Sequence, residues 1–197
     1  MAKKVNITIP NIDNLGIEVK LYGDWVKVDN VVTGVAKSIQ KGYDTSIDGF
    51  SKKLLRIVKT SIATGIPPRG SGVYWEPLSR ATIDKYGEHP IYYLTGLYHK
   101  SVGLFKYKSR TLVGLPIGKS RLSSSGGITL NQLAIILEYG TGGYGSGRSS
   151  GTIPPRPLWA PSLRAIGGKE YLRKLILTNI RKQLRTDFSI KANQVRW

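Results

Sequence analysis

Residues 31–64 read VVTGVAKSIQKGYDTSIDGFSKKLLRIVKTSIAT, and this stretch decides the fold class. Its apolar residues recur at steps of three and four, which is the spacing of one apolar stripe on an amphipathic helix. Three glycines inside the stretch each weaken a helix by up to about 1 kcal/mol, so a bend or break near the middle is expected. Gly65, followed by two prolines, should end the helix. The stripe consists of Val32, Val35, Ile39, Tyr43, Ile47, Phe50, Leu54, Val58 and Ile62.

The residues before this helix follow a period of two instead. Apolar and polar side chains alternate over residues 5–9 and again over residues 17–21, which is the pattern of half-buried strands. A third short strand is expected over residues 25–28. Residues 1–30 are therefore predicted to form N-terminal strands.

Shorter elements follow the long helix. Ser79 can cap a short helix that ends at Tyr86. Residues 104–115 contain a strand in which basic and apolar side chains alternate. Residues 130–139 form a short apolar helix, and residues 168–187 form a last helix with one largely apolar face and one basic face.

These patterns predict an α+β fold in one domain over residues 1–187. An antiparallel sheet packs with the long amphipathic helix and the C-terminal helix, and an extended glycine-rich loop and terminal arms complete the chain. Residues 188–197 show no period and are predicted to be a C-terminal arm. No apolar run reaches the roughly 20 residues of a membrane-spanning helix, so no membrane contact is expected. The lack of cysteine excludes a disulfide framework and favours a cytoplasmic origin.

The charge of the chain is large and unevenly distributed. Lys and Arg number 30 and Asp and Glu number 12, which gives a net charge of +18. Residues 1–88 carry 13 basic and 9 acidic side chains, a net of +4, whereas residues 89–197 carry 17 and 3, a net of +14. Such a surface implies a negative partner, either nucleic acid or an acidic protein face. Charge that serves only solubility is the alternative.

The motifs that could support catalysis are incomplete. The stretch from Gly114 to Ser120 has three residues where a phosphate-binding loop needs four, and Pro116 among them removes an N–H donor. The glycines at 140, 142 and 145 have dinucleotide-site spacing but follow a predicted helix, where a strand is needed. The two histidines have no neighbouring carboxylate cluster. We therefore expect no enzyme activity, no cofactor and no metal site.

Five short segments occur in an order that is more specific than any single motif. Each is a short stretch of apolar residues together with a glycine or a proline, which restricts the backbone to a turn or to an extended form. They are WEPLSRATI at residues 75–83, LTGLYHKSV at residues 94–102, VG at residues 113–114, AIILEYG at residues 134–140 and IPPRP at residues 153–157.

In this order the segments resemble the phage tail-completion and head–tail joining (neck) family, to which the Mu-type virion morphogenesis proteins look related. The resemblance covers about residues 55–185. It implies a structural virion protein that forms a homo-oligomeric ring, expected to have six copies, around the DNA channel. Its partners would be the head-closure or connector and tail-terminator proteins of the same virion. It would be made in the host cytoplasm and reside in the virion neck. A sequence-independent nucleic-acid-binding protein is the alternative.

The candidate interaction residues lie in the C-terminal half. The glycine-rich loop of residues 140–151 is too long and too polar to pack on its own domain, and ring subunits contribute such loops to their neighbours. The candidate interface residues are Tyr139, Tyr144, Arg156, Pro157 and Trp159. The candidate contacts to channel DNA or to an acidic partner are Lys119, Arg121 and Arg148.

Two side chains carry specific expectations. Arg156 lies between prolines on extended backbone that is not expected in the deep core, and a guanidinium held in this way suits a carboxylate or phosphate partner. Local bonds from Arg156 to backbone carbonyls are the alternative. Trp75 is expected to be buried against the short helix that begins near Ser79.

Overall fold

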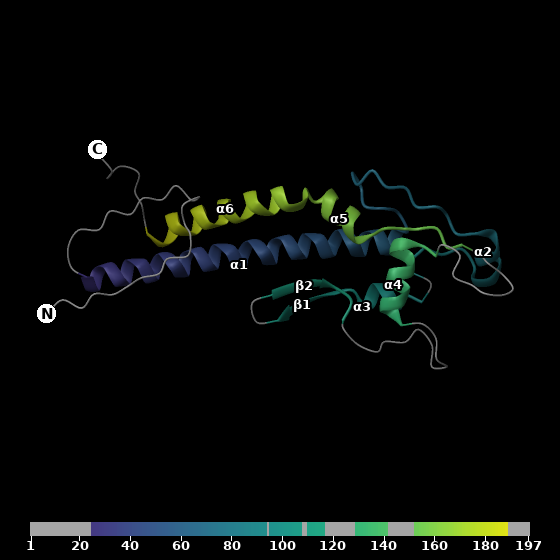
Figure 1. Cartoon of the computed structure of the whole chain (residues 1–197), viewed down its shortest axis with the longest axis horizontal. Helices are drawn as coiled ribbons and strands as arrows, with labels where there is room; N and C mark the ends of the chain where they lie inside the picture. Colours follow the sequence, from purple (N-terminus) through teal and green to yellow (C-terminus); the bar gives the residue numbers. More distant parts are fainter. Residues whose placement is uncertain (1–24, 94, 108–109, 117–128, 142–151, 189–197) are drawn as a thin grey trace. The chain divides into compact units, whose positions relative to one another are not determined.

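The computed structural model of this chain shows helices and one strand pair within the residues that it describes (Figure 1). The chain divides into two compact units, residues 1–37 and residues 38–197, where the sequence predicts one domain over residues 1–187. The structure describes residues 25–93, 95–107, 110–116, 129–141 and 152–188. In these ranges the elements are α1 (Trp25–Thr64), α2 (Arg80–Tyr86), α3 (Leu97–Ser101), β1 (Gly103–Tyr107), β2 (Arg110–Gly114), α4 (Leu130–Tyr139), α5 (Trp159–Ala165) and α6 (Gly168–Asp187).

The predicted α+β fold class is confirmed. Strands β1 and β2 pair antiparallel, from Gly103 opposite Gly114 to Tyr107 opposite Arg110. The alternation over residues 104–115 therefore belongs to a hairpin. The predicted strands over residues 5–9 and 17–21 fall outside the described residues, as do residues 189–197 of the predicted C-terminal arm.

Helix α1 begins earlier than the sequence pattern predicts. It starts at Trp25, so the prediction of a strand over residues 25–28, and of strands up to residue 30, is wrong. The period of two there covers only four residues, and Trp25, Val28 and Val32 also continue the helical spacing of three and four. The helix then runs without a break to Thr64. It ends at Gly65, which has a φ of 68°, as predicted.

The face that α1 buries between residues 38 and 50 is made largely of small side chains. Ser38, Gly42, Ser46 and Phe50 recur every four residues and are all buried. A Cβ atom on Gly42 would lie 2.7 Å from the Cα atom of Ile180 in α6. The small residues thus allow the two helix backbones to approach closely. We call this set of four residues the α1 seam.

Polar and aromatic contacts hold α6 against the α1 seam. Asn179 Nδ2 donates to Ser46 Oγ at 3.0 Å, and Ser46 Oγ lies 3.3 Å from the Leu175 carbonyl oxygen. The rings of Phe50 and Tyr171 are 6.3 Å apart. These contacts confirm the predicted largely apolar face of α6, and they leave its basic face toward solvent.

The predicted stripe of α1 is therefore wrong over part of its length. Tyr43 is exposed, and Ile39 and Ile47 are only half-buried. The spacing of apolar residues predicts that the most hydrophobic face of α1 is buried. Here α6 lies against the face with the smallest side chains instead, because only small side chains let the two backbones approach closely. Farther along the helix the predicted stripe is confirmed, because Val58 and Ile62 are fully buried.

The main core lies around the last turns of α1. Large apolar side chains from several segments pack there, and most are less than a tenth exposed. Burial of such side chains contributes about 1.5–3 kcal/mol each. Its buried members are Val58, Ile62, Trp75, Tyr92, Tyr98, Val102, Leu130, Leu137 and Leu158.

Candidate interaction surface

Residues 152–158 form an extended Pro-rich segment, here called the strap, that is hydrogen-bonded to α4. The Arg156 N–H donates to the carbonyl of Leu137 at 2.7 Å. The Thr141 N–H donates to the carbonyl of Ile153 at 2.9 Å, and the Ile153 N–H donates back to Thr141 Oγ1 at 2.9 Å. The strap therefore follows the C-terminal end of α4 with a fixed register.

Gly140 permits this approach. It ends α4 with a φ of 73°, a conformation that L side chains rarely adopt. A Cβ atom at this position would lie 2.7 Å from the carbonyl oxygen of Ile153 and 2.9 Å from the nitrogen of Pro155. Both the backbone conformation and the contact with the strap therefore require glycine here.

Arg156 is buried inside its own chain. Its side chain is 5% exposed, so the expectation that it lies on backbone outside the deep core is wrong. The Nε atom donates to the carbonyl of Glu76 at 2.9 Å, and Nη2 donates to the carbonyl of Pro77 at 3.1 Å. Burial lowers the pKa of Arg156, with opposing contributions from Tyr92 and Glu76. Among the described residues Arg156 forms no ion pair, and the alternative of local bonds to carbonyls is the one observed.

Aromatic side chains also connect Trp75 and Tyr92 to the strap. Trp75 is buried, as predicted, and its Nε1 donates to the carbonyl of Pro157 at 2.9 Å. Its ring lies 5.2 Å from that of Tyr92, whereas α2, the predicted packing partner, buries none of its residues. The Tyr92 hydroxyl donates to the Arg156 carbonyl. Burial raises the pKa values of both Tyr92 and the neighbouring Tyr98.

Glu138 joins α4 to the start of α5. One carboxylate oxygen, Oε2, accepts from the N–H of Leu158 at 2.7 Å and from the N–H of Trp159 at 3.3 Å. Leu158 provides no side-chain cap for α5, so Glu138 supplies the acceptor that the helix start lacks. A negative charge at this end of a helix is also favourable to the helix dipole.

Four of the five segments singled out in the sequence thus contribute to one hydrogen-bonded and aromatic cluster. Residues 75–77 and 137–141 are far apart in the chain but are both hydrogen-bonded to the strap. Tyr98 joins them through the ring of Tyr92, whose hydroxyl donates to the strap. The side chains of Trp75, Glu138 and Arg156 therefore form hydrogen bonds within the chain that stabilise the fold. Tyr92 and Glu138 were not predicted as site residues, because their roles depend on carbonyl and N–H groups that no side-chain pattern shows.

The candidate interface residues have different environments. Tyr139 is 77% exposed, whereas Pro157 and Trp159 are half-buried and Arg156 is buried. Ile135, which was not predicted, is 60% exposed and lies one helical turn before Tyr139. Its spacing from Tyr139 could have indicated an outer face of α4. Tyr144, Lys119, Arg121 and Arg148 lie outside the described residues.

An exposed apolar surface results beside the strap. Ile135 and Tyr139 lie on one side of α4, and Ile153 of the strap, 39% exposed, is bonded to Thr141 just beyond the helix end. We call Ile135, Tyr139 and Ile153 the α4 outer face. A groove of about 950 Å³ borders the strap. It is lined by Ile153 itself together with Leu133, Leu137, Tyr86, Thr82 and His89, among others.

One polar atom of this groove has no hydrogen-bond partner among the described residues. His89 Nδ1 lies 2.8 Å from the carbonyl oxygen of Pro90 and donates to it, because a carbonyl only accepts. His89 Nε2 is the second nitrogen of this ring, and it is buried and unpaired.

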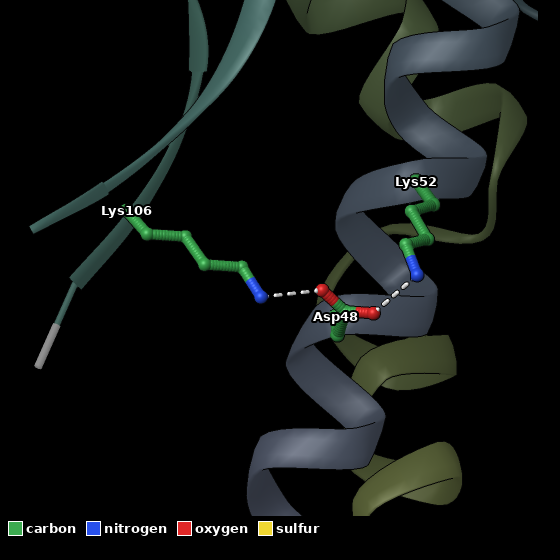
Figure 2. A network of polar contacts seen from close by, with 3 residues as sticks. All are labelled: Asp48, Lys52 and Lys106. Carbon is green, nitrogen blue, oxygen red and sulfur yellow. Dashed lines mark ion pairs between the residues drawn. The ribbon is translucent and has the colours of Figure 1, made fainter.

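A second groove, of about 1110 Å³, lies between α1 and the hairpin and contains a small ion-pair network. Asp48 of α1 pairs with Lys52 at 2.6 Å and with Lys106 of β1 at 2.9 Å, as Figure 2 shows. The hydrogen bonds from Lys52 and Lys106 hold the pKa of Asp48 below its usual value. The network ties the hairpin to α1 above the pH at which Asp48 is protonated.

Comparisons with known proteins give no relative. No protein family, curated protein or solved structure matches this chain. Across the described ranges, no helix is both long and apolar enough to cross a membrane. The same ranges contain no group of three or more His, Cys, Asp or Glu residues that could hold a metal ion.

Proposed function

We propose that this chain is a structural virion protein of a tailed bacteriophage, a neck or tail-completion subunit that joins head and tail. The support is the convergence of the ordered segments. Those at residues 75–83, 134–140 and 153–157 meet through Arg156, Glu138 and Trp75 in one cluster. Segments that carry the family resemblance therefore depend on one another physically, which is expected if they are features of one shared fold.

The α4 outer face is the surface that this role would use for contact between copies. A large apolar side chain that is exposed beside other apolar side chains favours a protein interface. A ring requires that this face meet a different surface on the next copy, because heterologous contacts close into rings. We propose six copies around the DNA channel, with head-closure or connector and tail-terminator proteins above and below.

The proposed role is tested by the composition of phage particles. Density-purified particles should contain the chain at a fixed copy number, measured by quantitative mass spectrometry against the portal protein. Its absence from particles that still contain portal and tail proteins would contradict the proposal. A sequence-independent nucleic-acid-binding protein, the second candidate that the net charge of +18 suggests, would be free in the cell and absent from particles.

The role of the α4 outer face has a closely matched control. Ile135→Ser with Tyr139→Ser should reduce ring formation, measured by native mass spectrometry and sedimentation, without changing the melting temperature. Ile66 and Tyr74 are 59% and 76% exposed, which matches the 60% and 77% of Ile135 and Tyr139. Ile66→Ser with Tyr74→Ser should leave the ring intact. Equal losses in both double variants, or none in either, would show that the α4 outer face is not the contact.

A further inference from the structure

The basic face of α6 forms a line of three cations directly opposite its buried face. Lys174, Arg181 and Arg185 are all exposed and lie within about 40° of one another around a helix with 100° per residue. We call these three residues the α6 ridge. Thr178, also exposed, falls on the same line and adds a hydroxyl donor.

The charge of the ridge is not balanced by the described part of the chain. The ion pairs there use Asp48 and Asp84, and none includes a ridge residue. Glu170 lies one helical turn before Lys174 but forms no ion pair with it. Helix α6 carries six cations and two carboxylates, so its own net charge is 6 − 2 = +4.

The ridge is also held in place. The opposite face of α6 is bound to α1 by Asn179 and packs on the α1 seam through Ile180. Asp187, at the end of the helix, accepts from Ser38 at 2.7 Å. The Cα atoms of the three cations therefore keep a constant spacing, so a bound partner would have to order their side chains but not the backbone.

We propose that the α6 ridge is a contact site for the phosphate backbone of duplex DNA. Along the helix axis Lys174 and Arg181 are about 10 Å apart, and Arg181 and Arg185 are about 6 Å apart. Phosphates of one DNA strand recur every 3.4 Å or so along the duplex, so each cation can reach a different phosphate. The arginines can bind phosphate oxygens in a bidentate way.

An acidic protein face fits the ridge less well than DNA does. The centre of a protein interface is depleted in charge and enriched in aromatic side chains. From Lys174 to Arg185 the ridge line contains only cations and one threonine, with no apolar side chain at its centre. That composition is typical of contacts that hold the DNA backbone without reading its sequence. The inference concerns the free protein and does not rest on the proposed virion role.

The test measures the binding of a labelled random-sequence duplex by fluorescence anisotropy between 50 and 200 mM salt. Lys174→Gln, Arg181→Gln and Arg185→Gln are combined in a ridge variant. Arg69→Gln, Lys100→Gln and Arg164→Gln are combined in a control that removes the same charge from exposed positions elsewhere. Glutamine is a good helix former, so both variants should retain the circular dichroism of the parent.

The ridge variant should lose the salt dependence that its three phosphate contacts provide. The slope of log K against log salt should become shallower by about 2.7, so that the parent loses roughly 40-fold more affinity across the salt range. The control variant should keep the slope of the parent. If the ridge variant loses helix content, Arg181→Gln and Arg185→Gln alone should each reduce the slope by about 0.9.

Three results would overturn the proposal. The parent could fail to bind the duplex at 50 mM salt. The two triple variants could lose affinity equally, which would assign binding to net charge alone. Polyglutamate with the same number of negative charges as the duplex could bind the parent as tightly as DNA does and bind the ridge variant more weakly. That result would assign the ridge to an acidic protein partner. None of these results bears on whether the chain is present in virions.

Discussion

Replacing Gly42 and Gly49 by alanine should have opposite effects on stability. Both glycines lie inside α1, and neither has a positive φ. Alanine in a helix interior is favoured over glycine by about 1 kcal/mol. The surroundings differ, because a Cβ atom on Gly49 has nothing within 4 Å, whereas one on Gly42 meets the Ile180 backbone at 2.7 and 2.9 Å.

The magnitude follows from these two terms. Gly49→Ala should stabilise the protein by about 1 kcal/mol, because only the helix term changes. In Gly42→Ala the contact is with backbone atoms, which cannot rotate away, so α6 must shift. Overpacking of this kind costs about 1–3 kcal/mol. After the helix gain is subtracted, Gly42→Ala should be up to about 2 kcal/mol less stable than the parent.

Urea unfolding of the two variants and the parent, followed by circular dichroism, measures the difference directly. Thermal melts should separate the variants by about 2–4 °C for each kcal/mol in a chain of this size. If Gly42→Ala is stabilised as much as Gly49→Ala, then α6 does not lie against Gly42 and the account of the α1 seam fails. If both variants are less stable than the parent, alanine does not stabilise α1 relative to glycine at these positions.

Two further predictions concern the cluster around the strap. Glu138→Ala should destabilise the protein by about 1–3 kcal/mol in urea unfolding, because the buried Leu158 N–H loses its acceptor, and Glu138→Gln should lose less because it keeps an oxygen. Burial raises the pKa of Tyr98 above its usual value of 10.0, because the folded protein disfavours the phenolate. The contribution of Tyr98 to the free energy of unfolding is therefore fully present below pH 10 and is lost as the pH rises toward the folded-state pKa. Stability should therefore fall above about pH 10 in the parent and fall less steeply in Tyr98→Phe. Parallel pH curves for the two proteins would show that Tyr98 does not ionise on unfolding.

Much of the fold could be predicted from local sequence. The bounds of α4 and α6 match the prediction, because both helices are long enough to show a period and Gly140 gives α4 a clear end. Helix α5 was missed, since its seven residues show too little periodicity and contain Pro161. The face of α1 that meets α6 was missed for a different reason. Hydrophobic periodicity gives no weight to glycine and serine, which are selected here by the distance between two backbones.

The candidate site could be predicted only in part, and Arg156 shows why. Its position between prolines correctly indicated a fixed side chain, but the acceptors are the carbonyls of Glu76 and Pro77, some 80 residues earlier. Every residue has a carbonyl, so no sequence pattern distinguishes these two. Tyr139 was identified from its place in a segment, and its exposure agrees with an interface without testing one.

The hydrogen bonds within the chain distinguish the residues that stabilise the fold from those that can contact a partner. Arg156, Glu138 and Trp75 use their polar groups within the chain, so substituting them perturbs folding before it can perturb recognition. The α4 outer face and the α6 ridge form none of these bonds. One is apolar and the other cationic, so they suit different partners: another copy of the chain and a phosphate backbone. Because they lie on different helices, changes at one should leave binding at the other intact, and the two roles can be measured independently.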